Sequence, residues 1–126
     1  MEVDKTIKKY LKCLEDSDYE SMIKLFSEDA VVHSPLYGEI KADKFYKDLF
    51  KDTSNSDITL MNIFKSQNNS NSAAGHFRYD WVLEDGTPTS FECVDILKFN
   101  DNGEIKELII IYDTSDVRNS FEEMKE

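Results

Sequence analysis

The sequence predicts an α+β domain in which helices pack on one face of a curved antiparallel β-sheet. Apolar residues recur at helical spacing through the first 50 residues, and from Asp57 onward the apolar period changes to two. Short stretches with turn chemistry separate the alternating segments, which is typical of successive strands joined by tight turns. Helices first and strands afterwards favour this two-layer architecture.

Three helices and one short strand are predicted in the first half of the chain. The first helix ends near Asp16, and Ser17 with Glu20 forms a capping-box pattern that opens the second. A strand over residues 29–35 follows, and the third helix begins after the loop at Gly38. The apolar positions of the three helices are, in order, Val3, Ile7, Tyr10, Leu11 and Leu14; Met22, Ile23 and Phe26; and Ala42, Phe45, Tyr46, Leu49 and Phe50.

The second half of the chain predicts an antiparallel meander and a last helix. The connections QNNSNS, EDGTP and NDNG are rich in turn-forming residues. After the meander, Asp113, Thr114 or Ser115 can cap a helix whose apolar face includes Phe121. The predicted strands lie near residues 58–66, 73–84, 89–99 and 104–113.

Length and charge limit the classes of function. A chain of 126 residues and 14.6 kDa fits one domain, residues 1–126. The net charge of −11 disfavours nucleic acids and anionic membrane surfaces as partners. The acidic start, MEVDKT, does not resemble a secretion signal, and the longest apolar run is too short to span a bilayer, so we expect a cytoplasmic protein. Cys13 and Cys93 have no metal-binding spacing, and no metal or cofactor is expected.

One strand contains a misfit. Because side chains alternate along a strand, Asp95 shares a face with the apolar Phe91, Cys93, Leu97 and Phe99. Burial in apolar surroundings raises the pKa of a carboxyl group by up to roughly 3 to 5 units, so a neutral hydrogen-bond donor at pH 7 is expected. A purely structural carboxyl is the alternative.

The last two strands are apolar on both faces. Val94 and Ile96 oppose the face of Asp95, and Ile109 and Ile111 oppose the other face of the last strand. A sheet of this kind needs a second cover besides the helices, because monomers rarely expose a large apolar patch. The pattern therefore predicts a homodimer through the convex face.

Two segments, YLKCLEDSDYESMIKLFSEDAVVHSP and DILKFNDNGEIKELIIIYD, and the order of elements resemble the nuclear transport factor 2-like superfamily, in particular its SnoaL-like and ketosteroid-isomerase-like bacterial members. The resemblance covers nearly the whole chain and implies a cone-shaped, cystatin-like fold. That scaffold hosts isomerases, cyclases, dehydratases, epoxide hydrolases and non-catalytic binding modules, so the resemblance is informative about fold more than about function.

The resemblance to ketosteroid isomerases implies an oxyanion hole. Tyr10 falls on the tyrosine of that site and Asp95 on its protonated acid. The position of the family's general base is occupied by Ser34, which is not basic near neutral pH, although the adjacent His33 could take protons. A role for Tyr10 in the core alone would also fit its helical stripe.

A second partial match is to limonene-epoxide-hydrolase-like members, which use an Arg-x-Asp pair to activate water. Arg78 and Asp80 reproduce the pair, whereas Ile110 stands where those enzymes have another acid. Both family comparisons imply that His76, Arg78 and Asp80 line the pocket while Trp81 meets a partner subunit. A solvated strand face is the alternative for this pair.

The expected function is binding of a small, mostly apolar, oxygen-bearing molecule, with isomerisation, dehydration or cyclisation by proton transfer next to a carbonyl. Tyr10 and Asp95 would stabilise the oxyanion, and His33 or Asp80 would be the base. A non-catalytic binding or interaction module and epoxide-hydrolase-like water activation by Arg78 and Asp80 remain alternatives. Predicted ligand contacts are Ser34, Tyr37, Phe45, Phe50, Met61, Phe64, His76, Leu108 and Tyr112, several of which a plain core role would explain equally well.

Overall fold

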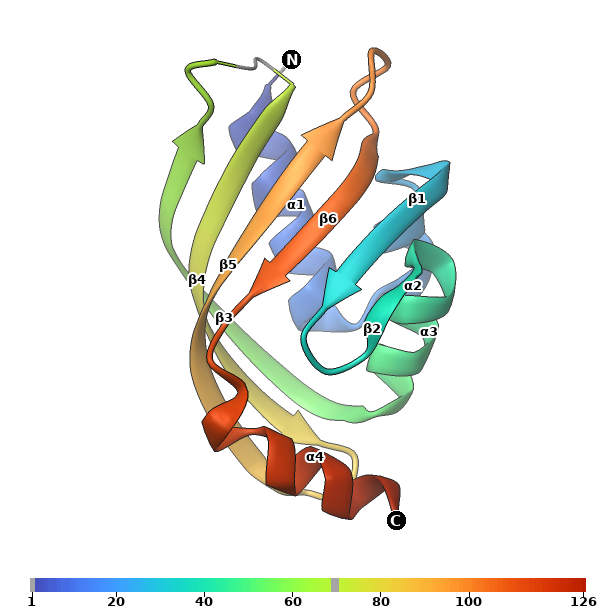
Figure 1. The fold of residues 1–126 in the computed structure, drawn as a ribbon, viewed down its shortest axis with the longest axis vertical. Coiled ribbons are helices and arrows are strands. Elements are labelled where there is room, and N and C mark those ends of the chain that lie inside the picture. The colour runs from blue at the N-terminus through green and yellow to red at the C-terminus, as the bar shows by residue number, and fades with distance from the viewer. Residues whose placement is uncertain (1, 69–70) are drawn as a thin grey trace.

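The computed structural model describes residues 2–68 and 71–126 and contains a strongly curved six-stranded sheet with helices on its concave side (Figure 1). This arrangement confirms the predicted α+β class. The elements are α1 Val3–Asp16, α2 Tyr19–Ile23, β1 Phe26–Ser34, β2 Gly38–Lys41, α3 Ala42–Lys51, β3 Thr53–Lys65, β4 Ser72–Leu83, β5 Pro88–Phe99, β6 Ile105–Ile111, the 3₁₀ turn η1 Thr114–Asp116, and α4 Arg118–Lys125.

The sheet is mixed rather than wholly antiparallel, which corrects one part of the prediction. Its strand order is β2-β1-β6-β5-β4-β3, and β3 to β6 form the predicted antiparallel meander. Strand β1 lies parallel to β6, because the chain leaves β1 through β2 and α3 and begins the meander at the far edge. The predicted turn at 67–72 includes residues 69 and 70, which lie outside the described residues.

The boundaries between the early elements also differ from the prediction. Ser17 ends α1 with a left-handed backbone (φ 51°), and the cap of α2 is Asp18, whose side chain accepts a hydrogen bond from the amide of Ser21 at 3.2 Å. Helix α2 is a short turn, and Phe26 begins β1 instead of continuing the helix. Strand β3 begins at Thr53, several residues before the period-two pattern becomes clear.

Strand register decides which side chains face the helices. Gly75 on β4 pairs with Asp95 on β5, and Phe77 pairs with Cys93, so the odd-numbered positions of β4 share the face of Asp95. These odd positions are buried under α1 and α3. Helix α1 approaches the sheet closely at Gly75, where an added Cβ would lie 3.1 Å from Cγ2 of Ile7.

Helix α4 crosses the end of the curved sheet that is furthest from the N-terminus (Figure 1). The ring of Phe121 packs against Tyr37 and Trp81, with centroids 5.2 and 6.3 Å apart. Lys125 pairs with the buried Asp52 at the end of α3, with its Nζ 2.7 and 2.8 Å from the two carboxylate oxygens. The C-terminal helix is therefore fixed to the body by aromatic packing and an ion pair.

None of the helices in the described parts of the chain is long and apolar enough to cross a membrane.

Candidate functional site

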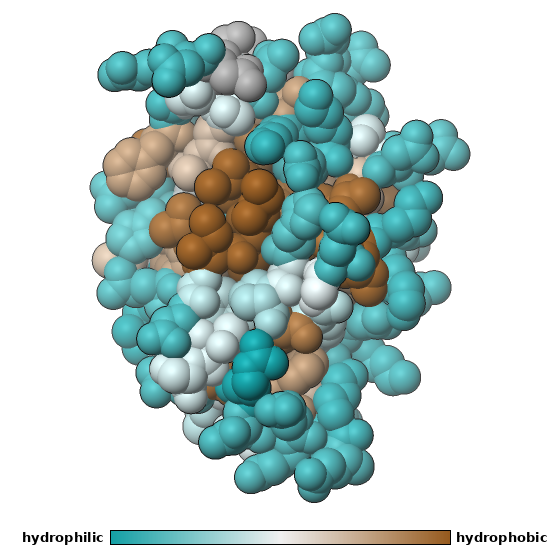
Figure 2. Space-filling view, in the orientation of Figure 1, coloured by the Kyte–Doolittle hydropathy of each residue, from teal (hydrophilic) through white to brown (hydrophobic). Residues whose placement is uncertain are grey.

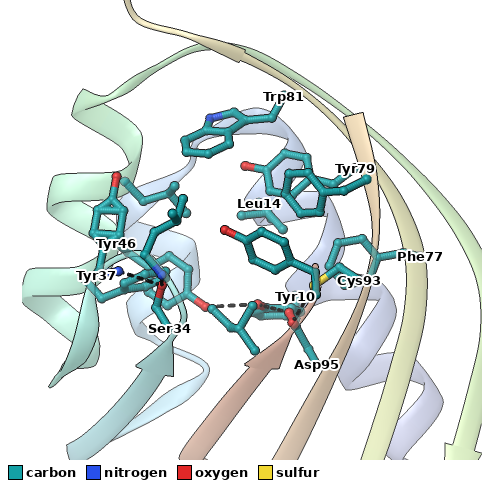
Figure 3. Close-up of a pocket in the computed structure, with 16 residues that line it drawn as sticks. Tyr10, Leu14, Ser34, Tyr37, Tyr46, Phe77, Tyr79, Trp81, Cys93 and Asp95 are labelled. Carbon is teal, nitrogen blue, oxygen red and sulfur yellow. Dashed lines mark hydrogen bonds between the residues drawn. The ribbon is translucent and has the colours of Figure 1, made fainter. Parts of the chain in front are cut away.

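A narrow cavity lies between the concave face of the sheet and helices α1 and α3 (Figure 3). About 40 Å³ is open to the centres of water molecules, which is space for a few waters or one small ring. Aromatic and aliphatic side chains from α1, α3 and β4 to β6 form most of the wall. Among the described residues that line the cavity, Asp95 is the only one with a charged side chain.

Asp95 is held by donors from two elements. The Tyr10 hydroxyl on α1 donates a hydrogen bond to Oδ2 of Asp95 at 2.6 Å, and the Cys93 thiol donates to Oδ1 at 3.2 Å. The hydroxyl of Tyr46 on α3 donates in turn to that of Tyr10 at 3.0 Å. Asp95 is only 2 % exposed, so the chain Tyr46–Tyr10–Asp95 forms a buried polar end in an otherwise apolar cavity (Figure 3).

The pKa of Asp95 reflects two opposing effects. Burial raises it from 3.8 to about 6, while the hydrogen bonds from Tyr10 and Cys93 favour the ionised form and act in the opposite direction. At pH 7 only about one tenth of the Asp95 side chains are neutral. The expected neutral donor is thus the minor form at pH 7 and becomes the major form below about pH 6.

Two further cavity tyrosines differ in what their hydroxyls contact. Tyr37 donates to Oδ2 of Asp52 at 2.6 Å, which connects the cavity wall to the ion pair with Lys125. Tyr112 stacks on Phe91 with ring centroids 4.1 Å apart. Its hydroxyl forms no hydrogen bond within residues 2–68 and 71–126, so it is available to a ligand.

The prediction that His76, Arg78 and Asp80 line the cavity is wrong. These side chains lie on the outer face of β4, where Arg78 is 51 % and Asp80 40 % exposed, and the two form an ion pair with Nη2 to Oδ1 at 3.1 Å. His76 pairs with Glu92 on the same face. Because Gly75 pairs with Asp95, the inward face of β4 is the one with Phe77, Tyr79 and Trp81, so Trp81 belongs to the cavity wall rather than to a subunit contact.

His33 does not line the cavity. Its ring lies between two carboxylates, with Nε2 2.7 Å from Glu107 and Nδ1 3.4 Å from Glu39. Ser34 does line the cavity, but its Oγ accepts hydrogen bonds from two backbone amides of the following turn at 3.0 and 3.2 Å. The structure therefore does not place the predicted base His33 near Asp95.

Only some of the predicted ligand contacts line the cavity. Met61 and Phe64 are 47 % and 54 % exposed outside the cavity, and the prediction is wrong for them. Phe64 pairs with Ala74 on the outer face of β4, and Met61 falls at the break in register between Leu60 and Asn62. Leu108 and Phe50 pack in the core without lining the cavity, which also corrects the prediction. The predicted contacts that do line it are Ser34, Tyr37, Phe45 and Tyr112.

Sequence reasoning did not assign polar contacts to three residues at or near the cavity. Cys93 could have been found from its place two positions before Asp95 on the same strand face. Tyr46 was placed in the apolar stripe of its helix, with no signal for its hydroxyl. Asp52 follows a helix and carries no pattern of its own; its burial depends on Tyr37 and Lys125, which are distant in sequence.

The described part of the chain contains no cluster of three or more histidine, cysteine, aspartate or glutamate side chains that could hold a metal ion.

Comparison with known proteins gives a family model and similar folds. The model for the SnoaL-like domain matches residues 7–108. A crystal structure of an NTF2-like protein of unknown function from Exiguobacterium sp. 255-15 has 17 % sequence identity, covers 87 % of this chain and 99 % of that one, and gives a TM-score of 0.74. A comparison with curated proteins gave no match.

Two further solved structures have TM-scores of 0.75 and 15 % identity. One is AclR from Streptomyces galilaeus, a proposed hydroxylase, with 95 % of both chains covered. The other is the epoxide hydrolase/cyclase-like enzyme SalBIII, which acts in pyran ring formation in the polyether salinomycin, with 90 % of this chain and 92 % of that one covered. At these identities the similarity establishes the fold alone.

Proposed function

The chain belongs to the family of SnoaL-like domains, and we propose that it binds a small, mostly apolar molecule through a carbonyl or enolate oxygen and promotes proton transfer next to that oxygen. The observation that carries the proposal is Asp95, a carboxyl group 2 % exposed in an aromatic cavity, with the Tyr10 hydroxyl 2.6 Å from Oδ2. A buried acid of this kind has the chemistry to stabilise a developing oxyanion.

The pKa of Asp95 makes the proposal dependent on pH. A carbonyl oxygen is only an acceptor, so Asp95 must be neutral to donate to it. Because the pKa is about 6, binding of a ketone at pH 7 takes up close to one proton from solvent. Stabilising the enolate oxygen lowers the cost of removing the neighbouring proton even where water accepts that proton.

Binding without catalysis is the second candidate function. It is favoured because Asp95 is the only charged side chain among the described cavity-lining residues, and the predicted bases His33 and Asp80 lie elsewhere. The epoxide-hydrolase alternative is not proposed further, because Arg78 and Asp80 are on the exposed face.

The conversion of 3-cyclohexen-1-one into the conjugated 2-cyclohexen-1-one tests the proposal. The wild type should accelerate this conversion, and Asp95→Asn should reduce the rate by roughly 10²- to 10⁴-fold while circular dichroism shows an intact fold. Asp80→Asn is the matched control, since it makes the same chemical change outside the cavity, and it should leave the rate unchanged.

Three other outcomes have distinct meanings. Binding of 2-cyclohexen-1-one that weakens above pH 6, without accelerated conversion, would establish the binding module. Equal binding by the wild type and Asp95→Ala at pH 5 would refute the role of Asp95, since alanine has no donor for the ligand oxygen. Absence of binding by the wild type at pH 5 would refute the proposal as a whole.

We further propose that the protein forms a homodimer through the outer face of the sheet. Figure 2 shows an apolar patch over β5 and β6, where the cross-strand pairs Val94 with Ile111 and Ile96 with Ile109 gather. Ile111 is 50 % exposed, and a monomer rarely exposes an apolar side chain within a contiguous apolar patch of this kind. Sedimentation should give a dimer for the wild type and a monomer for Ile109→Lys, and a monomeric wild type at micromolar concentration would contradict this assembly.

A further inference from the structure

Each carboxyl oxygen of Asp95 accepts a hydrogen bond from one neighbouring side chain. Oδ2 accepts from the Tyr10 hydroxyl at 2.6 Å, and Oδ1 accepts from the Cys93 thiol at 3.2 Å. All three side chains are buried and line the cavity. Each oxygen can accept a second hydrogen bond, but in so narrow a cavity a ligand oxygen that approaches one of them competes for space with the donor already there.

The two donors are not equally fixed. The Tyr10 hydroxyl donates to Asp95 and accepts from Tyr46 at 3.0 Å, and the two rings pack edge to face at 6.4 Å. The Cys93 thiol is a weak donor that turns about a single side-chain bond. Displacing the thiol costs less than displacing the hydroxyl, because an O–H group forms a stronger hydrogen bond to a carboxylate than an S–H group does.

We propose that Oδ1 is the oxygen of Asp95 that meets the ligand, and that Cys93 is a positioning residue that donates to Oδ1 until a carbonyl ligand binds and then releases it. The proposal rests on the proposed function of Asp95. It also specifies the ligand chemistry: an oxygen that accepts but does not donate, such as that of a ketone or aldehyde. On binding, one proton from solvent joins Oδ1, the thiol turns away, and the new O–H donates to the ligand oxygen.

The surroundings of Asp95 allow its ionisation to be read without interference. The described titratable groups whose pKa values are raised by the charge of Asp95 are phenols and a thiol that are themselves buried, so each stays neutral between pH 4 and 9. A change in binding across this range therefore reports the protonation of Asp95. These groups are Tyr10 on α1, Tyr46 on α3, Tyr79 on β4, Cys93 on β5 and Tyr112 after β6.

Replacing Cys93 by alanine should change the balance between the two forms of Asp95. Loss of the thiol donor removes a hydrogen bond to the ionised form, so the pKa should rise from about 6 toward about 7. The neutral fraction at pH 7 then grows from about one tenth to about one half, and affinity for a ketone increases about fivefold. At pH 5 both proteins are almost fully neutral at Asp95, and their affinities should agree.

Cys93→Ser is the matched comparison, because it keeps a donor of similar size and strengthens it. The serine hydroxyl should lower the Asp95 pKa below its wild-type value and weaken ketone binding at pH 7, again with little effect at pH 5. Either variant alone is sufficient for the test if the other does not fold.

The test measures the Asp95 pKa by carbon-detected NMR without ligand, and the affinity for 2-cyclohexen-1-one by calorimetry at pH 5 and pH 7. The expected result is an affinity change confined to pH 7 and opposite in sign for the two variants. An unchanged pKa of Asp95 in both variants would overturn the inference, as would an affinity change of equal size at both pH values, because the thiol would then only occupy space. Absence of ketone binding by the wild type at pH 5 would instead refute the proposed function, and the inference with it.

Discussion

Replacing Asp95 by asparagine should make the protein more stable relative to the wild type as the pH rises. The carboxyl group has a pKa of about 6 in the folded protein and an ordinary value of 3.8. A carboxyl group with a raised pKa contributes most to stability below pH 3.8, and this contribution is lost as the pH rises through 6. An asparagine has no such dependence.

The magnitude follows from the difference between the two pKa values. Each unit is worth about 1.4 kcal/mol, so ionised Asp95 costs about 3 kcal/mol of folding free energy at pH 7 relative to its neutral form. Asp95 is 2 % exposed, and solvent screening therefore reduces this cost little. The free energy of unfolding of Asp95→Asn minus that of the wild type should increase by about 2 kcal/mol between pH 4 and pH 7, because the unfolded carboxyl group is already more than half ionised at pH 4.

Urea unfolding at fixed protein concentration, followed by the fluorescence of the single tryptophan, measures this difference. Trp81 is buried beside the cavity and reports loss of the fold. Carboxylates elsewhere titrate equally in both proteins and cancel in the difference. Asp80→Asn is a control of opposite sign, because Ser90 and Arg78 lower the pKa of Asp80, so its stabilising contribution is present at neutral pH and lost on acidification.

A difference between Asp95→Asn and the wild type that stays constant from pH 4 to pH 7 would refute the reasoning. It would mean that the carboxyl group is solvated in the folded protein, whereas a difference that decreases with rising pH would mean that it is paired with a cation. The ketone-binding proposal would then lose its physical basis, since Asp95 would not become neutral near physiological pH.

Three other substitutions test the supports of the cavity. Asp52→Asn breaks the ion pair that holds α4 and should destabilise the protein by roughly 1 to 3 kcal/mol, with faster proteolysis of the C-terminal helix; unchanged proteolysis would contradict this role. Gly75→Ala places a Cβ 3.1 Å from Cγ2 of Ile7 and should cost about 1 kcal/mol, which Ile7→Leu in the same chain should partly restore because leucine lacks this methyl group. Tyr10→Phe removes the donor at Oδ2 and should raise the pKa of Asp95 above 6 in an NMR titration, whereas a lowered pKa would show that Tyr10 does not favour the ionised form.

Much of the fold could be predicted because its signals are local. The change from helical spacing to a period of two located the helices and the meander, and turn residues located their connections. The α2 region was predicted less well, because Ser17 and Asp18 both suit a helix cap and only the backbone of Ser17 decides between them. The parallel pairing of β1 with β6 joins segments more than 70 residues apart, and no local pattern indicates it.

The polar end of the cavity was predicted in part. Asp95 stands out as a carboxyl group in an apolar stripe, and the family resemblance connected it with Tyr10, which the structure places 2.6 Å away. The hydroxyl of Tyr46 and the thiol of Cys93 carry no such contrast, because both residue types are common in cores.

Taken alone, the sequence determined which residues of a strand share a face, because alternation is a property of the extended backbone. It did not determine which face is inside. Arg78 and Asp80 could line the cavity together with Asp95 only if an even-numbered residue of β4 paired with Asp95. The structure pairs Gly75 with Asp95 instead, which places the odd-numbered residues of β4 inside. A register shift of one residue would reverse every side chain of β4, so the composition of the cavity depends on strand pairing that tertiary packing alone specifies.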